Sequence, residues 1–458
     1  MMIINEGDPL SNLASVLRKA ERRPLLLYGA AALLALGFGG FTFLTAGFHP
    51  EPSAVIFALL FFLAQILLIS EKRFDAVTLL GAAVCLACAC YARVRLLHLE
   101  SDDFTSFLSV WVEQLSALSV RDALVTPIGD YNLPYLYFLL LVSRLNVAPI
   151  IAIKAFSCFF DLLMAFFAMK TLSLVVSDRR VQLCAYLVTF SLPTVIMNSA
   201  HWAQCDSVYV CFCILSLYGA MKGNGRLCAA AWTAAFCFKL QAIFILPALF
   251  IALVMGRVKL RHLLWIPAVF ALSLLPALIA GRSLSSCLSI YLSQTGEYPR
   301  FALNAPTIWQ LFEGLDFGDA YSFATVMLAG EALLLFMYFC LTGIKSFTPE
   351  SLLRLAFLSS MLVPYVLPRM HERYFYMADV LSFLYFLTDR KKWYIPAAMI
   401  LSSVSSYVYV LSGAVDFNQK YVAVVFLVIL AAEMKELFSS FRGATGDIVS
   451  LMQNDEGK

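Results

Sequence analysis

The chain has 458 residues, of which 61% are hydrophobic and 14% are charged. Soluble globular proteins carry roughly 25% charged residues, so this composition excludes a soluble protein. The 33 basic and 30 acidic residues give a net charge of +3, which provides no dense basic surface for a nucleic acid partner. Apolar runs near the roughly 20-residue length of a membrane-spanning helix recur along the chain, which predicts an all-α polytopic membrane protein.

The apolar runs define the membrane segments that we expect in chain order. Residues 1–23 are polar and end in a basic cluster, which predicts a cytoplasmic N-terminus. We predict a single transmembrane domain over residues 1–458 with 13 to 14 membrane segments. The runs fall near residues 24–46, 53–70, 76–97, 134–146, 148–176, 181–199, 207–222, 227–256, 262–281, 321–343, 350–366, 375–388, 394–412 and 420–438.

Basic residues assign the connecting loops to the two sides of the membrane, because Lys and Arg are enriched in cytoplasmic loops. Such residues cluster near 72–73, 179–180, 222–226, 257–261, 345, 390–392 and 435–442, which we therefore expect in the cytoplasm. The opposite loops, expected outside, are 47–52, 98–133, 200–206, 282–320, 367–374 and 413–419. Two of these external loops, 98–133 and 282–320, are large.

Two stretches do not fit a simple alternation of crossings. An odd number of crossings must separate Leu133 from Arg179, yet two runs lie between them. Either 134–146 is too short to span, or 148–176 folds back near Lys154 to Asp161. The run 227–256 has basic residues at both ends, which predicts two short crossings that turn at Lys239, Leu240 and Gln241. Broken helices at membrane depth occur where they line protein or water, so we expect a cavity near the outer leaflet.

The first large external loop contains an amphipathic pattern. After Ser101-Asp102-Asp103-Phe104, apolar residues continue at helical spacing: Phe107, Leu108, Trp111, Leu115 and Leu118. This pattern predicts a helix on the outer membrane surface. Asp103 directly precedes the run, so taken alone it is more typical of a helix N-cap than of a catalyst. The two roles are compatible, because a capping carboxylate keeps one oxygen free to accept a proton.

Polar residues also gather in two other external loops. Asp130, Tyr131 and Asn132 lie in a turn that begins a helix. The short loop after Ser199 contains His201, Trp202, Gln204 and Asp206. An interfacial Trp and a helix-capping Asp account for Trp202 and Asp206, but they leave His201 and Gln204 unexplained.

The segment Pro368–Tyr374 places Arg369, His371 and Arg373 outside, against the usual distribution of basic residues. A single acid, Glu372, cannot neutralise both arginines, so a bound anion is the better explanation. Lys239 adds a cation on the same side, and Arg forks suit phosphate oxygens, so we predict a phosphate site. In loop 282–320, Asn304 precedes Ala305 and Pro306, and the aromatic and amide residues of this loop are a weak indication of sugar binding.

Taken together, these stretches resemble the GT-C superfamily of integral-membrane glycosyltransferases, and within it the bacterial relatives of the second mannosyltransferase of GPI-anchor assembly. The matching stretches are residues 101–104 with Phe107, Leu108 and Trp111, then 128–135, 198–207, 238–241, 304–306 and 368–374. They follow the same order as in the family. The family often has Gly where this chain has Asp102, and Pro where it has Val110.

The resemblance implies an inverting enzyme that transfers a hexose, such as mannose, from a polyprenyl-phosphate sugar to a glycan, lipid or protein acceptor. It implies that Asp103 is the catalytic base, with Asp102 as the alternative, and that the site faces the outer side of a bacterial plasma membrane. The phosphate-binding candidates are Lys239, Arg369, His371 and Arg373, and the substrate-binding candidates are Asp130, Tyr131, Asn132, His201, Gln204, Asp206, Gln241 and Asn304. No cofactor is required, although a divalent cation held by Asp103, Asp130 and Asp206 is an alternative.

Other functions remain open at this point. A polysaccharide polymerase or ligase would use the same face and a similar Arg cluster. A transporter or flippase of polyprenyl-linked saccharides is less favoured, because no internal repeat is visible and the candidate charges lie at the outer ends of the runs. A zinc site at Cys85, Cys88 and Cys90 is also disfavoured, since no second pair of ligands follows at a suitable spacing.

Overall fold

The computed structural model describes residues 24–293, 301–312, 319–343, 347–414 and 418–455, and these are almost entirely helical. The basic cluster within residues 1–23 lies outside the described residues. The helices are α2 (Pro24–Thr45), α3 (Pro50–Ser70), α4 (Ala76–Leu96), η1 (Phe104–Leu108), α5 (Ser109–Ala117), α6 (Val120–Val125), α7 (Leu133–Val142), α8 (Pro149–Leu172), α9 (Arg179–Ser191), α10 (Pro193–Ile196), η2 (Met197–His201), α11 (Asp206–Met221), α12 (Gly225–Phe238), η3 (Leu240–Ile245), α13 (Leu246–Val254), η4 (Leu260–Leu264), α14 (Trp265–Ala280), α15 (Leu284–Ser293), η5 (Ile308–Phe312), α16 (Asp319–Gly343), α17 (Pro349–Val366), η6 (Glu372–Phe375), α18 (Tyr376–Thr388), η7 (Arg390–Lys392), α19 (Tyr394–Ser412) and α20 (Gln419–Asp455).

The protein is an all-α, multi-pass membrane protein. Seven helices in the described part of the chain are long and apolar enough to cross a membrane, and the bent pair Arg179–Ser191 and Pro193–His201 raises the number to eight. Four further apolar helices have only 10 to 17 residues: Leu133–Val142, Asp206–Met221, Gly225–Phe238 and Leu240–Val254. Full-length helices therefore do not reach the predicted 13 to 14 segments, because several apolar runs form helices shorter than a bilayer is thick.

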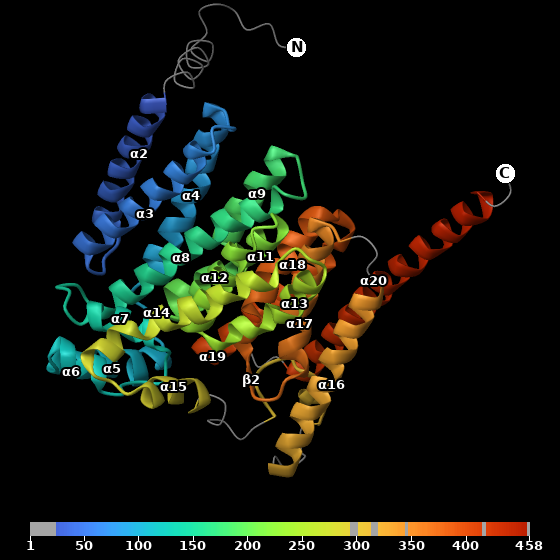
Figure 1. Ribbon diagram of the computed structural model, residues 1–458. Helices are drawn as coiled ribbons and strands as arrows, with labels where there is room; N and C mark the ends of the chain where they lie inside the picture. Colours follow the sequence, from blue (N-terminus) through green and yellow to red (C-terminus); the bar gives the residue numbers. More distant parts are fainter. Residues whose placement is uncertain (1–23, 294–300, 313–318, 344–346, 415–417, 456–458) are drawn as a thin grey trace, which may run out of the picture.

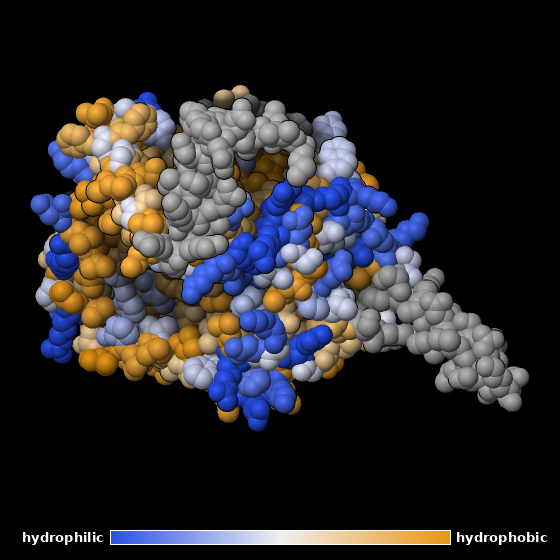
Figure 2. All heavy atoms as spheres, turned by 90° about the horizontal axis from the view of Figure 1, so that it is seen from above, coloured by the Kyte–Doolittle hydropathy of each residue, from blue (hydrophilic) through white to orange (hydrophobic). Residues whose placement is uncertain are grey.

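The predicted external loops gather at one end of the molecule. Figure 1 shows that α2 begins at the end drawn uppermost, whereas α5, α6, α15 and β2 lie at the opposite end. Figure 2 looks onto the uppermost end and shows hydrophilic residues in a band across its middle, with hydrophobic residues along its left side. An apolar periphery around polar ends is the arrangement expected of a bundle that crosses a lipid bilayer.

The structure shows how the chain runs in both stretches that do not fit a simple alternation of crossings. Helix α8 is continuous over 24 residues, so the run 148–176 does not fold back. Helix α7 has 10 residues, which at about 1.5 Å per residue is half of a hydrocarbon core. The predicted break at Lys239 is confirmed: α12 ends at Phe238, and Lys239 is extended (φ −148°, ψ 138°) before η3 begins.

Two short parallel strands join the second large loop to the turn at Arg369. In β1 (Ala302–Leu303) and β2 (Met370–His371), Ala302 pairs with Met370 and Leu303 with His371. The Arg369 N–H also donates to the Phe301 carbonyl at 2.9 Å. These bonds fix the backbone that carries the predicted phosphate-binding residues.

A buried ion pair holds the bent helix in place. The Arg93 guanidinium, which is 0% exposed, donates to Asp161 Oδ2 at 2.9 and 3.2 Å and to the Phe190 carbonyl at 2.7 Å. Carbonyls in the last turn of α9 lack the N–H donors that a continuous helix would supply. Arg93 donates to one of them, the Phe190 carbonyl. Asp161 also accepts from Ser199 Oγ in η2 at 2.6 Å, so the pair ties α4, α8, α9 and η2 together.

We expect Asp161→Asn to destabilise the protein by about 3–5 kcal/mol, because it leaves the Arg93 charge buried without a counter-ion. Glu71→Gln is the matched control, since Glu71 pairs at 2.9 Å with Lys170, whose side chain is 28% exposed; its loss is expected to be about 1 kcal/mol or less. Unfolding in detergent, followed by circular dichroism, measures both. Equal losses in the two variants would contradict this account of Arg93.

The two ends of the bundle lead to a topology prediction. Single cysteines at the exposed positions Thr105 and Ser285, in a cysteine-free background, should react with an impermeant maleimide in intact cells. Cysteines at the exposed positions Arg179 and Lys391 should react only after the cells are opened. Labelling of Thr105 and Ser285 from opposite sides would show that the two large loops do not meet on one face.

Candidate functional site

Asp103 is held by donors from three other residues. Its Oδ2 accepts from Trp202 Nε1 at 2.9 Å, from Gln204 Nε2 at 2.5 Å and from Arg373 Nη1 at 3.4 Å. Among the described residues, none donates a hydrogen bond to Oδ1, and 31% of the side chain is exposed. The carboxylate therefore has a fixed orientation and one oxygen that is available to a ligand.

The N-cap interpretation of Asp103 is wrong. Asp103 already has helical backbone angles (φ −63°, ψ −35°), and its side chain makes no capping bond. Ser101 takes that role, because its Oγ accepts from the Phe104 N–H at 3.3 Å. The helix that follows is amphipathic as predicted, with Phe104, Leu108 and Leu115 buried. Because Ser101 caps the helix, the Asp103 side chain is free to turn toward the loop at Trp202.

The loop after η2 places both of the neutral donors to Asp103. Gln204 is 2% exposed, and its backbone N–H donates to the Asn198 carbonyl at 2.9 Å. Its Oε1 accepts from Tyr131 Oη at 3.1 Å, while its Nε2 reaches Asp103. Gln204 thus links the turn at Tyr131 to the candidate base, which explains a polar residue that the sequence pattern left unexplained.

Asp206 and Lys239 form a second buried pair beside this loop. Lys239 Nζ lies 2.5 Å from Asp206 Oδ1, and Asn198 Nδ2 donates to Asp206 Oδ2 at 2.8 Å. The predicted capping role of Asp206 is wrong, because the N-cap position of α11 belongs to Cys205 and both Asp206 oxygens bind side chains. The Lys239 ammonium also lies 5.5 Å from the centre of the Tyr131 ring.

A pocket of about 450 Å³, here called the polar pocket, lies beside these residues. It is lined by Asp130, Tyr131, Phe238, Lys239, Leu240, Gln241, Ile243, Phe244, Val326, Leu367, Pro368, Arg369, Met370, His371, Arg373 and Tyr374. Seven of the predicted site residues are therefore brought together: Asp130, Tyr131, Lys239, Gln241, Arg369, His371 and Arg373. Asp103 is not part of the lining and reaches the pocket through its contact with Arg373.

Other predicted residues lie away from the pocket lining. Asp102 is exposed, and its backbone carbonyl accepts from Thr105 Oγ1. Asn132 is buried, and its Nδ2 donates to the Phe236 carbonyl at 3.2 Å, which ties α7 to the end of α12. His201 is half-buried at the end of η2, and Asn304 is exposed beside His371, with which it forms a backbone bridge.

The charges around the pocket differ from those expected from the sequence. Burial, together with the positive charges of Arg373 and Lys239, lowers the pKa of His371 to about 3, so the imidazole is neutral at pH 7 and adds no charge. Burial raises the pKa of Glu372 to about 7, against the opposing effect of Arg373. Burial also raises the pKa of Asp130, while Lys239 and Arg373 act in the opposite direction.

One residue of this site, Trp202, is not among the predicted functional residues. Trp202 was interpreted as an interfacial aromatic residue, but it donates to Asp103, and its ring lies 5.6 Å from the Arg373 guanidinium carbon. Glu372 is expected to pair with an arginine, and it lies 3.7 Å from Arg373 Nη1 with 5% of its surface exposed. A Trp in a short loop does not by itself distinguish a hydrogen-bond donor to a carboxylate from an interfacial aromatic residue.

The described residues contain no group of three or more His, Cys, Asp or Glu side chains arranged to hold a metal ion. Asp103, Asp130 and Asp206 therefore do not converge as a divalent-cation site would require. Cys85 and Cys88 are exposed on α4, whereas Cys90 is buried, so these three thiols do not share one face.

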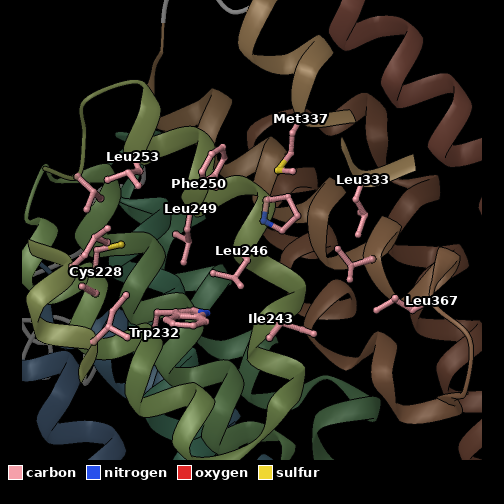
Figure 3. A pocket seen from close by; sticks show the side chains of 16 residues that line it. Cys228, Trp232, Ile243, Leu246, Leu249, Phe250, Leu253, Leu333, Met337 and Leu367 are labelled. Atoms are coloured by element: carbon pink, nitrogen blue, oxygen red, sulfur yellow. The ribbon is translucent and has the colours of Figure 1, made fainter. Parts of the chain in front are cut away.

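A second cavity, of about 550 Å³, adjoins the polar pocket and is almost wholly apolar. Figure 3 shows Leu333 and Met337 of α16 on one side of it, opposite Leu246 and Phe250 of α13. Ile243 and Leu367 line both cavities, so the polar pocket neighbours an apolar groove between α12, α13, α16 and α17. Such a pair of cavities suits a ligand with a charged head and a long hydrocarbon chain.

No protein-family model matches this chain, and a search of curated proteins gives no match.

The raised pKa of Glu372 leads to a pH prediction. Between pH 4.5 and about 7 the folded protein binds this proton more strongly than the unfolded chain, so Glu372 lowers stability as the pH rises through this window. The Glu372→Gln variant lacks this loss. At pH 4.5 we expect the variant to unfold at nearly the wild-type temperature. At pH 8 we expect its unfolding temperature to be several degrees higher, which corresponds to a gain in unfolding free energy of a few kcal/mol or less. A constant difference across this range in thermal unfolding would contradict a raised pKa.

Proposed function

We propose that this protein is an inverting glycosyltransferase that moves a hexose from a polyprenyl-phosphate donor to a glycan, lipid or protein acceptor. The observation that carries the proposal is the position of Asp103 beside a pocket that combines cationic side chains with an adjoining apolar cavity. A lipid-linked sugar phosphate has this combination of parts: a prenyl chain, a phosphate and a hydroxyl-rich ring.

The two cavities suggest how such a donor binds. Lys239, Arg369 and Arg373 line the polar pocket, where ammonium and guanidinium groups suit phosphate oxygens. The neutral His371 imidazole supplies hydrogen-bonding capacity there instead of charge. The apolar groove past Ile243 takes the first prenyl units. Asp130, Tyr131 and Gln241 then remain for the hydroxyl groups of the sugar.

The proposed reaction is a single displacement. Asp103 Oδ1 removes the proton of the acceptor hydroxyl as the acceptor oxygen attacks the anomeric carbon from the face opposite the phosphate. The bond between the anomeric carbon and the phosphate oxygen breaks, and the polyprenyl phosphate leaves with the bonding electron pair. Trp202 and Gln204 keep the carboxylate oriented through Oδ2. Arg369 and Arg373 stabilise the negative charge that develops on the leaving phosphate.

The proposal extends to architecture and location. A GT-C-like fold with 13 to 14 membrane segments requires that short helices such as α7, α11, α12 and α13 complete or line crossings that the long helices begin. The distribution of basic loops supports a cytoplasmic N-terminus and a site on the outer face of the membrane. With the resemblance, this location is the plasma membrane of a bacterium.

A transporter of polyprenyl-linked saccharides is the second candidate, and one observation favours it. Asp379 in α18 is 0% exposed, its Oδ1 accepts from Ser403 Oγ at 3.1 Å, and no cation pairs with it among the described residues. Intramembrane acids of this kind often belong to transport pathways. A transporter moves the donor unchanged, whereas a transferase releases polyprenyl phosphate.

The deciding experiment uses the purified protein in lipid nanodiscs with polyprenyl phosphates that carry single radiolabelled hexoses. Consumption of a donor, with release of polyprenyl phosphate and a product of inverted anomeric configuration by NMR, supports the proposal. A polymerase or ligase would instead require a donor with an oligosaccharide. Intact donors after incubation with glycan, lipid and protein acceptors would refute it.

We expect Asp103→Asn to reduce turnover by at least about 100-fold, because the amide has a similar size but cannot accept the acceptor proton. Folded yield and binding of the donor lipid should be retained. Asp102→Asn is the matched control, since this neighbouring carboxylate is exposed, and it should keep most of the activity. If Asp102→Asn abolishes transfer while Asp103→Asn does not, the base is Asp102.

A further inference from the structure

Arg373 lies between two carboxylates and holds neither at close range. Its Nη1 is 3.4 Å from Asp103 Oδ2 and 3.7 Å from Glu372 Oε1, while charge-assisted hydrogen bonds usually measure about 2.7–2.9 Å. Its Nε is buried and has no hydrogen-bond partner among the residues that the structure describes. Arg373 also lines the polar pocket. The guanidinium is therefore weakly held by its present partners and has unused donor capacity next to the space for a ligand.

The charge count around the pocket supports a change of partner on ligand binding. Lys239 is already paired with Asp206 at 2.5 Å. Titratable groups close enough to interact electrostatically with Arg373 include Asp103, Asp130, Tyr131, Cys205, Asp206, Lys239, His371, Glu372, Tyr374 and Tyr407. With Arg369 included, four carboxyl groups surround three cations. An entering phosphate finds no excess of positive charge, and for Arg373 it competes with the Asp103 and Glu372 carboxylates.

We propose that Arg373 exchanges partners when the donor binds: its guanidinium leaves Asp103 and takes the donor phosphate, so that Asp103 becomes an effective base only in the donor complex. The inference rests on the proposed function. It makes Arg373 a positioning residue for the base as well as a phosphate ligand. It also implies an order of events, since an acceptor hydroxyl that arrives first meets a carboxylate whose charge is still engaged by Arg373.

The exchange differs from a simpler arrangement in which Arg373 binds phosphate through Nε and keeps Asp103 on Nη1. If Asp103 anchors Arg373 for the phosphate, removing the carboxylate leaves binding unchanged or weakens it. If Asp103 competes with the phosphate, removing it strengthens binding. The two arrangements therefore predict opposite changes in affinity for the same substitution.

The test measures binding of undecaprenyl phosphate without sugar to the full-length protein in nanodiscs. We expect Asp103→Asn to bind it roughly three- to tenfold more tightly than wild type, in keeping with the loss of one partly exposed competing charge pair. Asp102→Asn removes the same charge one residue away without contact to Arg373 and should leave the affinity unchanged. In an Arg373→Ala background, Asp103→Asn should produce no gain, because the cation for which it competes is absent.

Each outcome decides between these accounts. Two outcomes overturn the exchange and leave the proposed transferase intact. In the first, the wild-type protein binds undecaprenyl phosphate and Asp103→Asn binds it no more tightly. In the second, Asp103→Asn binds it more tightly even in the Arg373→Ala background. A gain of equal size in Asp102→Asn assigns the effect to general repulsion and overturns it as well. No binding of undecaprenyl phosphate by the folded wild-type protein overturns the donor class itself, and with it the exchange.

Discussion

Arg93 and Asp161 meet inside the helix bundle, and the position of the candidate site depends on that pair. Arg93 takes the Phe190 carbonyl where α9 bends, and Asp161 accepts from Ser199 in η2. In a lipid bilayer a broken helix is stable only if the protein supplies partners for the freed backbone groups. With these bonds made, η2 continues directly into the short loop whose Trp and Gln side chains orient Asp103. A buried charged pair inside the bundle thus helps to position the Asp103 carboxylate at the end of the bundle.

The polar pocket is balanced in charge, and this bears on how it selects a ligand. Three cations and one carboxyl group line it, and three more carboxyl groups, those of Asp103, Asp206 and Glu372, pair with the lining cations. Burial keeps His371 neutral. A pocket with excess positive charge would bind any phosphate, including inorganic phosphate and phospholipid head groups. A balanced pocket binds a phosphate firmly only when additional contacts contribute. If the donor is the polyprenyl phosphate that we propose, the apolar groove provides these contacts to its prenyl chain, and its affinity depends on the whole amphipathic molecule.

Large parts of this arrangement were predictable from the sequence because they depend on residue periodicity and length. The helical class, the break at Lys239 and the amphipathic helix after Asp103 follow from such patterns. The span count did not, since an apolar run shows that a helix is buried but not that it is long enough to cross the bilayer. The capping roles failed for a different reason. Ser101 and Asp103 are both good N-caps, and the choice between them is made by Trp202, which is distant in sequence.

Backbone strain is concentrated where the loops around the candidate site meet. Five non-glycine residues among those described have positive φ, and three of them border the site: Ala203 (64°), Asn304 (53°) and Arg369 (64°). The left-handed conformation costs most residues roughly 1–2 kcal/mol and persists only where surrounding bonds enforce it. Here the enforcing bonds come from other loops: the β1–β2 pairing next to Asn304 and Arg369, and the contacts of the residues on either side of Ala203. The geometry of the pocket is therefore a property of the loops together, because no one of these segments would adopt it alone.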